Sequence, residues 1–141
     1  MKNKRRRDVY LDYYPTGELR GKIEHIGGIR NGKALFFNRA GVLISAERYK
    51  NDKPQGRCVF YDESGKYKGE ATFSKGLLNG LAIYYYKNGL IKAKKRFRKD
   101  KLDGKAERYS STGRLVSTNQ YWDANLASSK KVRKSRRKSI Q

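Results

Sequence analysis

The stretch Tyr85-Tyr86-Lys87-Asn88-Gly89-Leu90-Ile91 decides the fold, because its pattern recurs throughout the chain. A glycine returns every 24 residues without insertion or deletion, with an aromatic residue four positions before it and an apolar residue two positions after it. The glycines are Gly17, Gly41, Gly65, Gly89 and Gly113, the aromatic residues Tyr13, Phe37, Tyr61, Tyr85 and Tyr109, and the apolar residues Leu19, Leu43, Tyr67, Ile91 and Leu115. Such strict spacing indicates five copies of one structural unit.

Each unit is predicted to be a β-hairpin. The pair Asn88-Gly89 suits a hairpin loop, where glycine accepts a positive φ that a residue with a Cβ resists. The run Ile91-Lys92-Ala93-Lys94-Lys95-Arg96-Phe97-Arg98 follows the loop with a period-two pattern that is typical of a strand. The turn between one unit and the next is predicted in stretches such as Asn51-Asp52-Lys53-Pro54-Gln55-Gly56, which end at a second set of glycines preceded by Asn, Gln or Asp. These are Gly32, Gly56, Gly80 and Gly104.

The units are expected to stack, because a lone hairpin is marginally stable in water. Small residues recur beside the aromatic ones, which predicts rings lying over the backbone of the neighbouring unit. The expected fold is all-β, an elongated antiparallel β-hairpin repeat array of five 24-residue units and about ten strands. Its core is expected to be thin, since 36% of the residues are hydrophobic and 34% are charged. We predict a disordered basic arm at residues 1–8, the repeat domain at 9–127 and a disordered basic tail at 128–141.

The motif resembles the MORN repeat in its variant form, which is found in bacterial proteins of the YwqK-type antitoxin group and in other repeat proteins. The resemblance rests on Tyr61-Asp62-Glu63-Ser64-Gly65-Lys66-Tyr67 and on the matching stretch that ends at Ile91, with Asn79-Gly80 and Asp103-Gly104 as second turns. It covers nearly the whole repeat region. The resemblance implies a β-hairpin solenoid that binds partners and has no chemistry of its own, and proteins with this repeat have been linked to protein assembly and to anionic lipid.

The chain is unusually basic. The chain has 141 residues, with 35 Lys and Arg against 13 Asp and Glu, and a formal net charge of +22. Basic residues crowd both ends, and the repeat region is basic in its own right. The candidate residues in the C-terminal tail are Lys130, Lys131, Arg133, Lys134, Arg136, Arg137 and Lys138.

Within the repeats, the fourth return strand is the densest basic segment. Lys92, Lys94, Arg96 and Arg98 are expected to project from one face at steps of about 6.6 Å, close to the spacing of successive phosphates. Neighbouring units are expected to extend this band along the sheet, through Arg20, Lys22, Arg48, Lys50 and Lys68. The alternative is that lysines only keep the outer face polar and protect sheet edges.

Other residues give weaker signals. The periodic aromatic columns are expected to form the stacking core rather than platforms for nucleic-acid bases, whereas Tyr14, Tyr86 and Trp122 lie off these columns and could contact a partner or cover an end of the array. His25 stands in an otherwise aromatic column, and Cys58 in a column of alanines, which predicts a buried thiol.

Two functions from different classes remain open. The first is a non-catalytic scaffold that binds a protein partner, and the second is binding of DNA or RNA backbone through the tails and the basic band. Attachment to an anionic lipid surface is a lesser alternative. No enzyme motif, cofactor or metal site is expected. The single cysteine and the lack of a long apolar segment predict a soluble intracellular protein, cytoplasmic or, in a eukaryote, nuclear.

Overall fold

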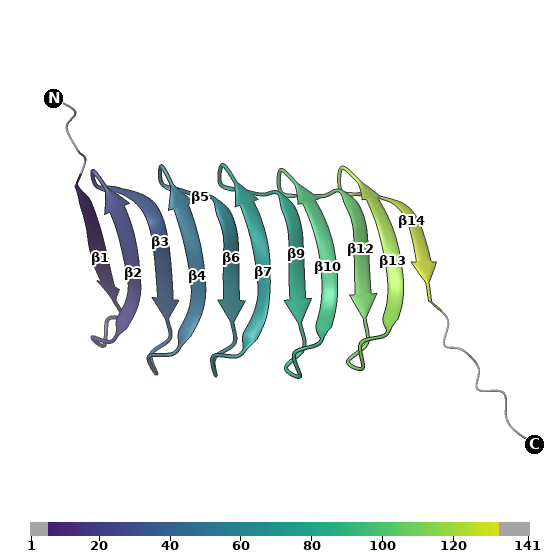
Figure 1. The fold of residues 1–141 in the computed structure, drawn as a ribbon, viewed down its shortest axis with the longest axis horizontal. Coiled ribbons are helices and arrows are strands. Elements are labelled where there is room, and N and C mark those ends of the chain that lie inside the picture. The colour runs from purple at the N-terminus through teal and green to yellow at the C-terminus, as the bar shows by residue number, and fades with distance from the viewer. Residues whose placement is uncertain (1–5, 133–141) are drawn as a thin grey trace, which may run out of the picture.

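The computed structural model describes residues 6–132 as one open antiparallel sheet of fourteen strands. Figure 1 shows the hairpins side by side in chain order, with the first and last strands at opposite ends of the array. The strands on the main path are β1 (Arg7–Tyr13), β2 (Leu19–Ile26), β3 (Ile29–Phe37), β4 (Leu43–Lys50), β6 (Gly56–Tyr61), β7 (Tyr67–Ser74), β9 (Gly80–Tyr85), β10 (Ile91–Arg98), β12 (Gly104–Tyr109), β13 (Leu115–Trp122) and β14 (Asn125–Lys131). The two-residue strands β5 (Lys53–Pro54), β8 (Leu77–Leu78) and β11 (Lys101–Leu102) pair beside this path. The all-β hairpin array is therefore confirmed.

The predicted hairpin turns are confirmed at the first set of glycines. In the loop between β9 and β10, the Tyr86 amide donates to the Leu90 carbonyl at 2.8 Å and the Gly89 amide donates to the Tyr86 carbonyl at 2.9 Å. Gly89 has a φ of 88°, in the region that favours glycine. The same two bonds recur at the other four loops, so the period in the sequence is a period of hydrogen bonds.

The second reversal lies at the start of the predicted connecting stretches and not at the glycines that end them. The chain turns at residue pairs such as Asn51 and Asp52, where both residues have positive φ, as type I′ hairpin turns require. Gly56 lies beyond this reversal and begins β6. Gly32, Gly80 and Gly104 take equivalent places, so all four glycines mark a strand irregularity and the prediction of turns at these residues was wrong. Their positive φ values, from 90° to 113°, still explain why glycine is needed there.

The polar residue before each of these glycines binds the next repeat. Gln55 Oε1 accepts a bond from the Lys75 amide at 2.8 Å, and Asn79 Oδ1 accepts one from the Lys99 amide at 3.4 Å. Backbone bonds run in parallel, such as that from the Gly76 amide to the Pro54 carbonyl at 2.9 Å. Each turn is thus tied to the unit before it, which holds neighbouring hairpins in register.

The core is thin, as predicted. The buried hydrophobic residues of the described chain are small ones, Ala34, Cys58, Ala71 and Ala82. A Cβ built at Gly21 would lie 3.2 Å from the Phe36 ring, and one at Gly69 would lie 2.6 Å from the Ile83 carbonyl oxygen. Rings and backbone therefore lie directly against these small positions.

The sheet reaches beyond the predicted limits of the repeat domain. Strand β1 begins at Arg7, within the predicted arm, and β14 continues to Lys131, within the predicted tail. Both end strands form because each pairs with a neighbour, β2 or β13. The rest of the arm and tail lies outside the described residues.

Candidate functional site

The register of the strands divides the side chains between two faces. One row of directly paired residues crosses the C-terminal part of the sheet: Ala93 on β10 pairs with Arg108 on β12, which pairs with Ser117 on β13, which pairs with Lys131 on β14. Paired residues of antiparallel strands point to the same side. We call this side the small-residue face, since it also carries the Ala34, Cys58, Ala82 and Ala106 column. The other side is the opposite face.

The four basic residues of β10 do not share a face as predicted. The register shifts between Ile91 and Ala93, so the side chain of Lys92 does not follow the alternation of faces along β10. Lys92 lines the same hollow as Ala93 and Lys95 on the small-residue face. Lys94 pairs with Ile83 and belongs to the opposite face, together with Arg96 and Arg98. A bulge at one residue therefore separates Lys92 from the other three.

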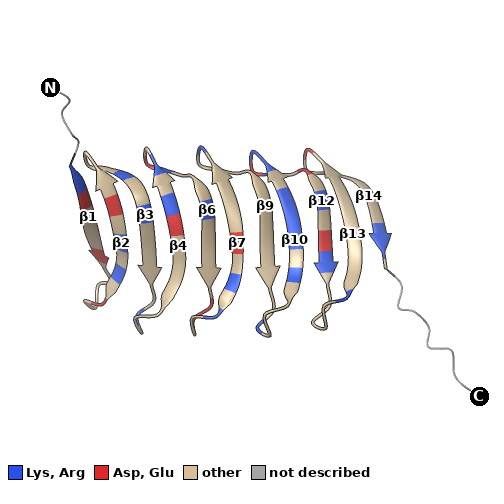
Figure 2. Ribbon diagram, in the orientation of Figure 1, with Lys and Arg blue, Asp and Glu red and all other residues tan. Residues whose placement is uncertain are grey.

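The predicted basic band is also interrupted along the array. Arg48 and Arg96 occupy equivalent positions in their units, but Thr72 stands there in the unit between them. Lys94 has Glu70 as its equivalent in that unit, where the carboxylate pairs with Arg57. Figure 2 accordingly shows basic residues concentrated on β10 but mixed with acidic ones on several other strands.

The remaining predicted residues are dispersed. Lys68 lies against the small-residue face near Tyr84 and Lys92, whereas Lys50 pairs with Lys53 beside a turn. Two of the predicted residues form ion pairs within the chain: Arg20 with Asp12 at 2.7 Å, and Arg98 with Asp103 at 3.2 Å. Among the tail residues, Lys130 pairs with Thr118 on the opposite face and Lys131 with Ser117 on the small-residue face. Arg133, Lys134, Arg136, Arg137 and Lys138 lie outside the described residues.

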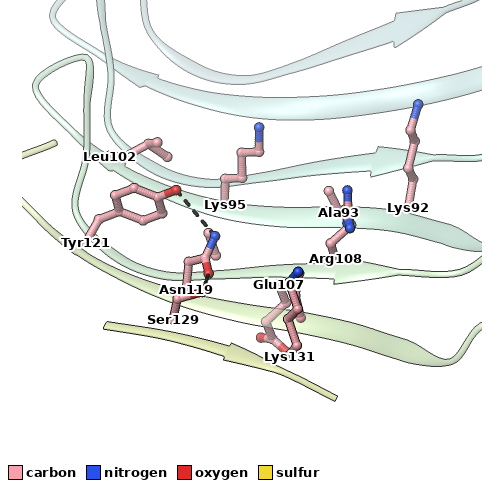
Figure 3. A pocket seen from close by; sticks show the side chains of 12 residues that line it. Lys92, Ala93, Lys95, Leu102, Glu107, Arg108, Asn119, Tyr121, Ser129 and Lys131 are labelled. Atoms are coloured by element: carbon pink, nitrogen blue, oxygen red, sulfur yellow. Dashed lines mark hydrogen bonds between the residues drawn. The ribbon is translucent and has the colours of Figure 1, made fainter. Parts of the chain in front are cut away.

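A hollow of about 440 Å³ lies on the small-residue face over β10, β12, β13 and β14. It is lined by Ala93, Ala106 and Ser117, whose small side chains form its floor, and by four basic residues that Figure 3 labels, Lys92, Lys95, Arg108 and Lys131. We call it the basic hollow, after its four cationic residues, Lys92, Lys95, Arg108 and Lys131. A second hollow of about 260 Å³ shares Lys92, Ala93 and Lys95 and continues toward Lys68 and Tyr84.

The positive charge of the basic hollow is not balanced within the described chain. Residues 6–132 show no ion pair to any of its four cations, although seven other Arg and Lys residues there do pair with carboxylates. Glu107 is the acidic residue that lines the hollow. Its alternation with Arg108 assigns it to the opposite face, and its Oε2 accepts a bond from the Tyr109 hydroxyl at 2.8 Å. The burial of that hydroxyl, followed by this bond, raises the pKa of Tyr109.

Polar groups cross the floor of the hollow. The Ser129 hydroxyl donates to Asn119 Oδ1 at 2.7 Å, and the Asn119 amide reaches the Tyr121 hydroxyl at 3.5 Å. Lys95 Nζ lies 5.6 Å from the centre of the Tyr84 ring, and Lys92 Nζ lies 5.7 Å from the centre of the Tyr86 ring, both cation–π contacts. The hollow thus combines hydrogen-bond donors and acceptors with cationic side chains.

One repeat column changes character at this hollow. The column that holds Phe36, Phe60 and Tyr84 has Asp12 in the first unit and Arg108 in the fifth. The column of Lys95 varies throughout the array and holds Ile23, Glu47, Ala71 and Asn119 in the other units. Sequence reasoning did not single out Lys95 or Arg108, because it followed one strand rather than each column. Comparison of the columns would have found Arg108.

The residues outside the aromatic columns have different roles. The Tyr14 and Tyr86 hydroxyls donate to the Phe37 and Tyr109 carbonyls, at 2.6 and 2.8 Å, and so join the loops of neighbouring hairpins. Trp122 is 68% exposed and is followed by β14, so it covers no end of the array.

The remaining candidates, His25 and Cys58, are buried and packed against other residues of the array. His25 is buried, stacks on Tyr10 with ring centroids 3.9 Å apart, and has Nδ1 3.0 Å from the Ile23 carbonyl oxygen. Cys58 is fully buried in its alanine column, and burial raises the pKa of its thiol. Within residues 6–132, no cluster of three or more His, Cys, Asp and Glu is placed to hold a metal ion. The same residues contain no helix that is long and apolar enough to cross a membrane.

Comparison with known protein families gives two matches, both in the middle of the chain. The family described as MORN repeat variant matches residues 54–75, and the family described as MORN repeat matches residues 70–91. These segments contain β6, β7 and β9, and the remaining hairpins have the same turns at the same spacing. A search of curated proteins found no match.

Proposed function

We propose that this chain, which is a MORN-repeat protein, is a non-catalytic interaction module that binds a protein partner. MORN repeats are generally found in protein-interaction or membrane-associated modules, and the family is typically non-catalytic. That the partner is a protein is our inference.

The observation that carries the proposal is the single layer of sheet. Its small-residue face has no second layer over it among the described residues, and several hairpins together form the basic hollow on that face. A sheet face hollowed by small residues offers a preformed surface, so a partner loses little free energy to reorganisation of the module. Separate repeats contribute to one continuous surface, as repeat proteins commonly use.

Site-specific photo-crosslinking tests the proposal. A benzophenone amino acid replaces Ser117, on the small-residue face, or Thr118, the next residue on the opposite face. We expect the full-length protein to form defined protein adducts in an extract of the source cells from position 117 and few from position 118. Equal labelling from both positions, or no protein adduct from position 117, would contradict the proposal.

Nucleic-acid binding is the second candidate, and the formal net charge of +22 favours it. If this candidate is correct, the affinity of the full chain for duplex DNA or single-stranded RNA falls steeply with salt, because bound lysines and arginines release counterions. The Lys94→Glu, Arg96→Glu double variant then binds more weakly than the wild type. Unchanged binding in that variant would remove the opposite face as the nucleic-acid site. Anionic lipid surfaces remain a lesser alternative, through the polybasic ends.

The location and any antitoxin role stay predictions. We infer an intracellular location, because the single cysteine of the chain provides no internal disulfide. If the module neutralises a toxin, its basic surface favours an acidic target, since complementary charge speeds association.

A further inference from the structure

We propose that the basic hollow binds an acidic peptide segment in an extended conformation. This inference rests on the proposed function and names the chemical class of its partner. It assigns the contact to Lys92, Lys95, Arg108 and Lys131.

The first argument is charge. The acidic residues of the described chain are largely engaged elsewhere, for example Asp12 with Arg20 and Glu70 with Arg57. The cations of the basic hollow have no such partner within residues 6–132. Four neighbouring cations repel one another and are stabilised by carboxylates, and the planar guanidinium of Arg108 can bind one carboxylate through two parallel hydrogen bonds.

The second argument is spacing. Arg108 and Lys131 lie in one paired row, two strand intervals apart, or about 9.6 Å at about 4.8 Å per interval. From β10 to β14 the hollow crosses three intervals, or about 14 Å. An extended peptide rises about 3.3 Å per residue, so a segment of about five residues spans this distance. Its alternate side chains project on one side, which allows two or three carboxylates to face the cations.

The third argument is the floor. Ala93, Ala106 and Ser117 keep the surface low between long basic side chains, so a peptide backbone can approach the sheet. Asn119 and Ser129 add an amide and a hydroxyl, which can bond to peptide groups as well as to each other. The peptide lies across the strands and adds no strand to the edge of the sheet.

The fourth argument distinguishes a peptide from single-stranded nucleic acid. Proteins that bind single strands combine a basic groove with open aromatic faces on which bases stack. The floor of the basic hollow contains one ring, Tyr121, which bonds to Asn119, and the nearby Tyr84 ring is contacted by the Lys95 ammonium. Carboxylates need no such rings, so the side chains present favour an acidic peptide.

The test uses the full chain and two double variants that make the same change in charge on the same two strands. Lys95→Glu with Arg108→Glu alters the basic hollow. Lys94→Glu with Lys105→Glu alters the opposite face of β10 and β12 and is the matched control. The probe is a fluorescein-labelled ten-residue peptide of alternating Glu and Ala, and binding is followed by fluorescence anisotropy at low and physiological salt.

We expect the hollow variant to bind the peptide at least about tenfold more weakly than the control variant, because hydrogen bonds to charged groups are lost. Circular dichroism melting shows whether both variants fold. If the Lys95→Glu, Arg108→Glu variant does not fold, the variant Lys95→Gln with Arg108→Gln replaces it in the binding assay. Equal loss in the two variants would overturn the inference. A uridine decanucleotide that binds more tightly than the peptide, and that depends on the same two residues, would overturn it in favour of nucleic acid.

The crosslinking result keeps the two proposals apart. If protein adducts from position 117 persist in the Lys95→Glu, Arg108→Glu variant, the module binds a protein partner, but the acidic residues of that partner do not make the contact. If the wild type gives no adducts, the proposed function itself fails.

Discussion

The reasons why two positions require glycine can be tested by adding one methyl group at each, one in a hairpin loop and one within a strand. Gly89 has a φ of 88°, and a Cβ built on it meets no atom within 4 Å. The cost of Gly89→Ala is therefore backbone strain alone, about 1–2 kcal/mol for a residue with a Cβ in the left-handed region. Alanine also reduces the conformational entropy of the unfolded chain, which stabilises the folded protein by about 0.4–1 kcal/mol. We expect a net loss of about 1 kcal/mol.

Gly69→Ala tests packing instead of strain. The φ of Gly69 is not in the left-handed region, but a Cβ there would lie 2.6 Å from the Ile83 carbonyl oxygen on β9. Backbone must move to relieve this contact, and overpacking of this kind costs about 1–3 kcal/mol. Gly69 also pairs with Tyr84, where β7 and β9 join. The substitution therefore disturbs the junction between two hairpins, and we expect it to lower the free energy of unfolding by more than Gly89→Ala does.

Urea unfolding followed by far-ultraviolet circular dichroism measures both values. Stability falls linearly with denaturant, so each loss appears as a lower midpoint, and an unchanged slope shows that the same surface is exposed on unfolding. A Gly89→Ala protein that is as stable as the wild type would refute the turn assignment. A Gly69→Ala protein more stable than Gly89→Ala would refute the close approach of β7 to β9.

Three further predictions concern single side chains. The buried Cys58 thiol should react with iodoacetamide much more slowly in the native protein than in urea, because burial raises its pKa, and Cys58→Ala should leave the melting temperature nearly unchanged; rapid native labelling would contradict its burial. Burial, followed by the bond to Glu47, raises the pKa of Tyr49 from 10.0 to about 12, so its neutral form should stabilise the fold fully below pH 10.0 and progressively less as the pH rises through about 12. Spectroscopic titration should therefore show a late tyrosine component that is smaller in Tyr49→Phe, and a titration unchanged by that substitution would refute the assignment. The exposed Trp122 should be quenched by acrylamide nearly as strongly in the folded as in the unfolded protein, whereas strong protection on folding would show that it is covered.

The sequence was sufficient for the hairpin and its period, because local chemistry determines them. A positive φ at Gly89 and small positions beside aromatic ones both follow from the residue types and their spacing. The connecting stretch 51–56 was also predicted as a turn, but its glycine was wrongly taken as part of the reversal. Asn51 and Asp52 form the reversal themselves, because Asn and Asp adopt positive φ more readily than most residues.

The faces of the strands were harder to predict, because alternation holds only while the register does. The slip beside Ile91 carries Lys92 away from the face of Lys94, and a bulge of this kind has no clear mark in the sequence of one strand. The role of Asn79 was also missed, since its bond to the Lys99 amide joins residues 20 positions apart and depends on how the hairpins stack.

The site is better predicted from departures from the repeat than from its most basic strand. A repeat position that serves stacking is filled alike in the inner units, as Phe36, Phe60 and Tyr84 are, whereas Asp12 and Arg108 occupy it in the first and fifth units. Replacement of that ring by Arg108 removes apolar packing area and adds a charge with no carboxylate partner in the described chain, unlike Asp12, which pairs with Arg20, so ring stacking does not explain the change. Arg96, in contrast, lies on a face whose equivalent positions are polar in every unit and needs no function to explain it. If this reasoning is correct, Arg108→Phe should raise the stability of the array while it abolishes tight binding of the acidic peptide, and a variant that loses both would show that Arg108 is structural.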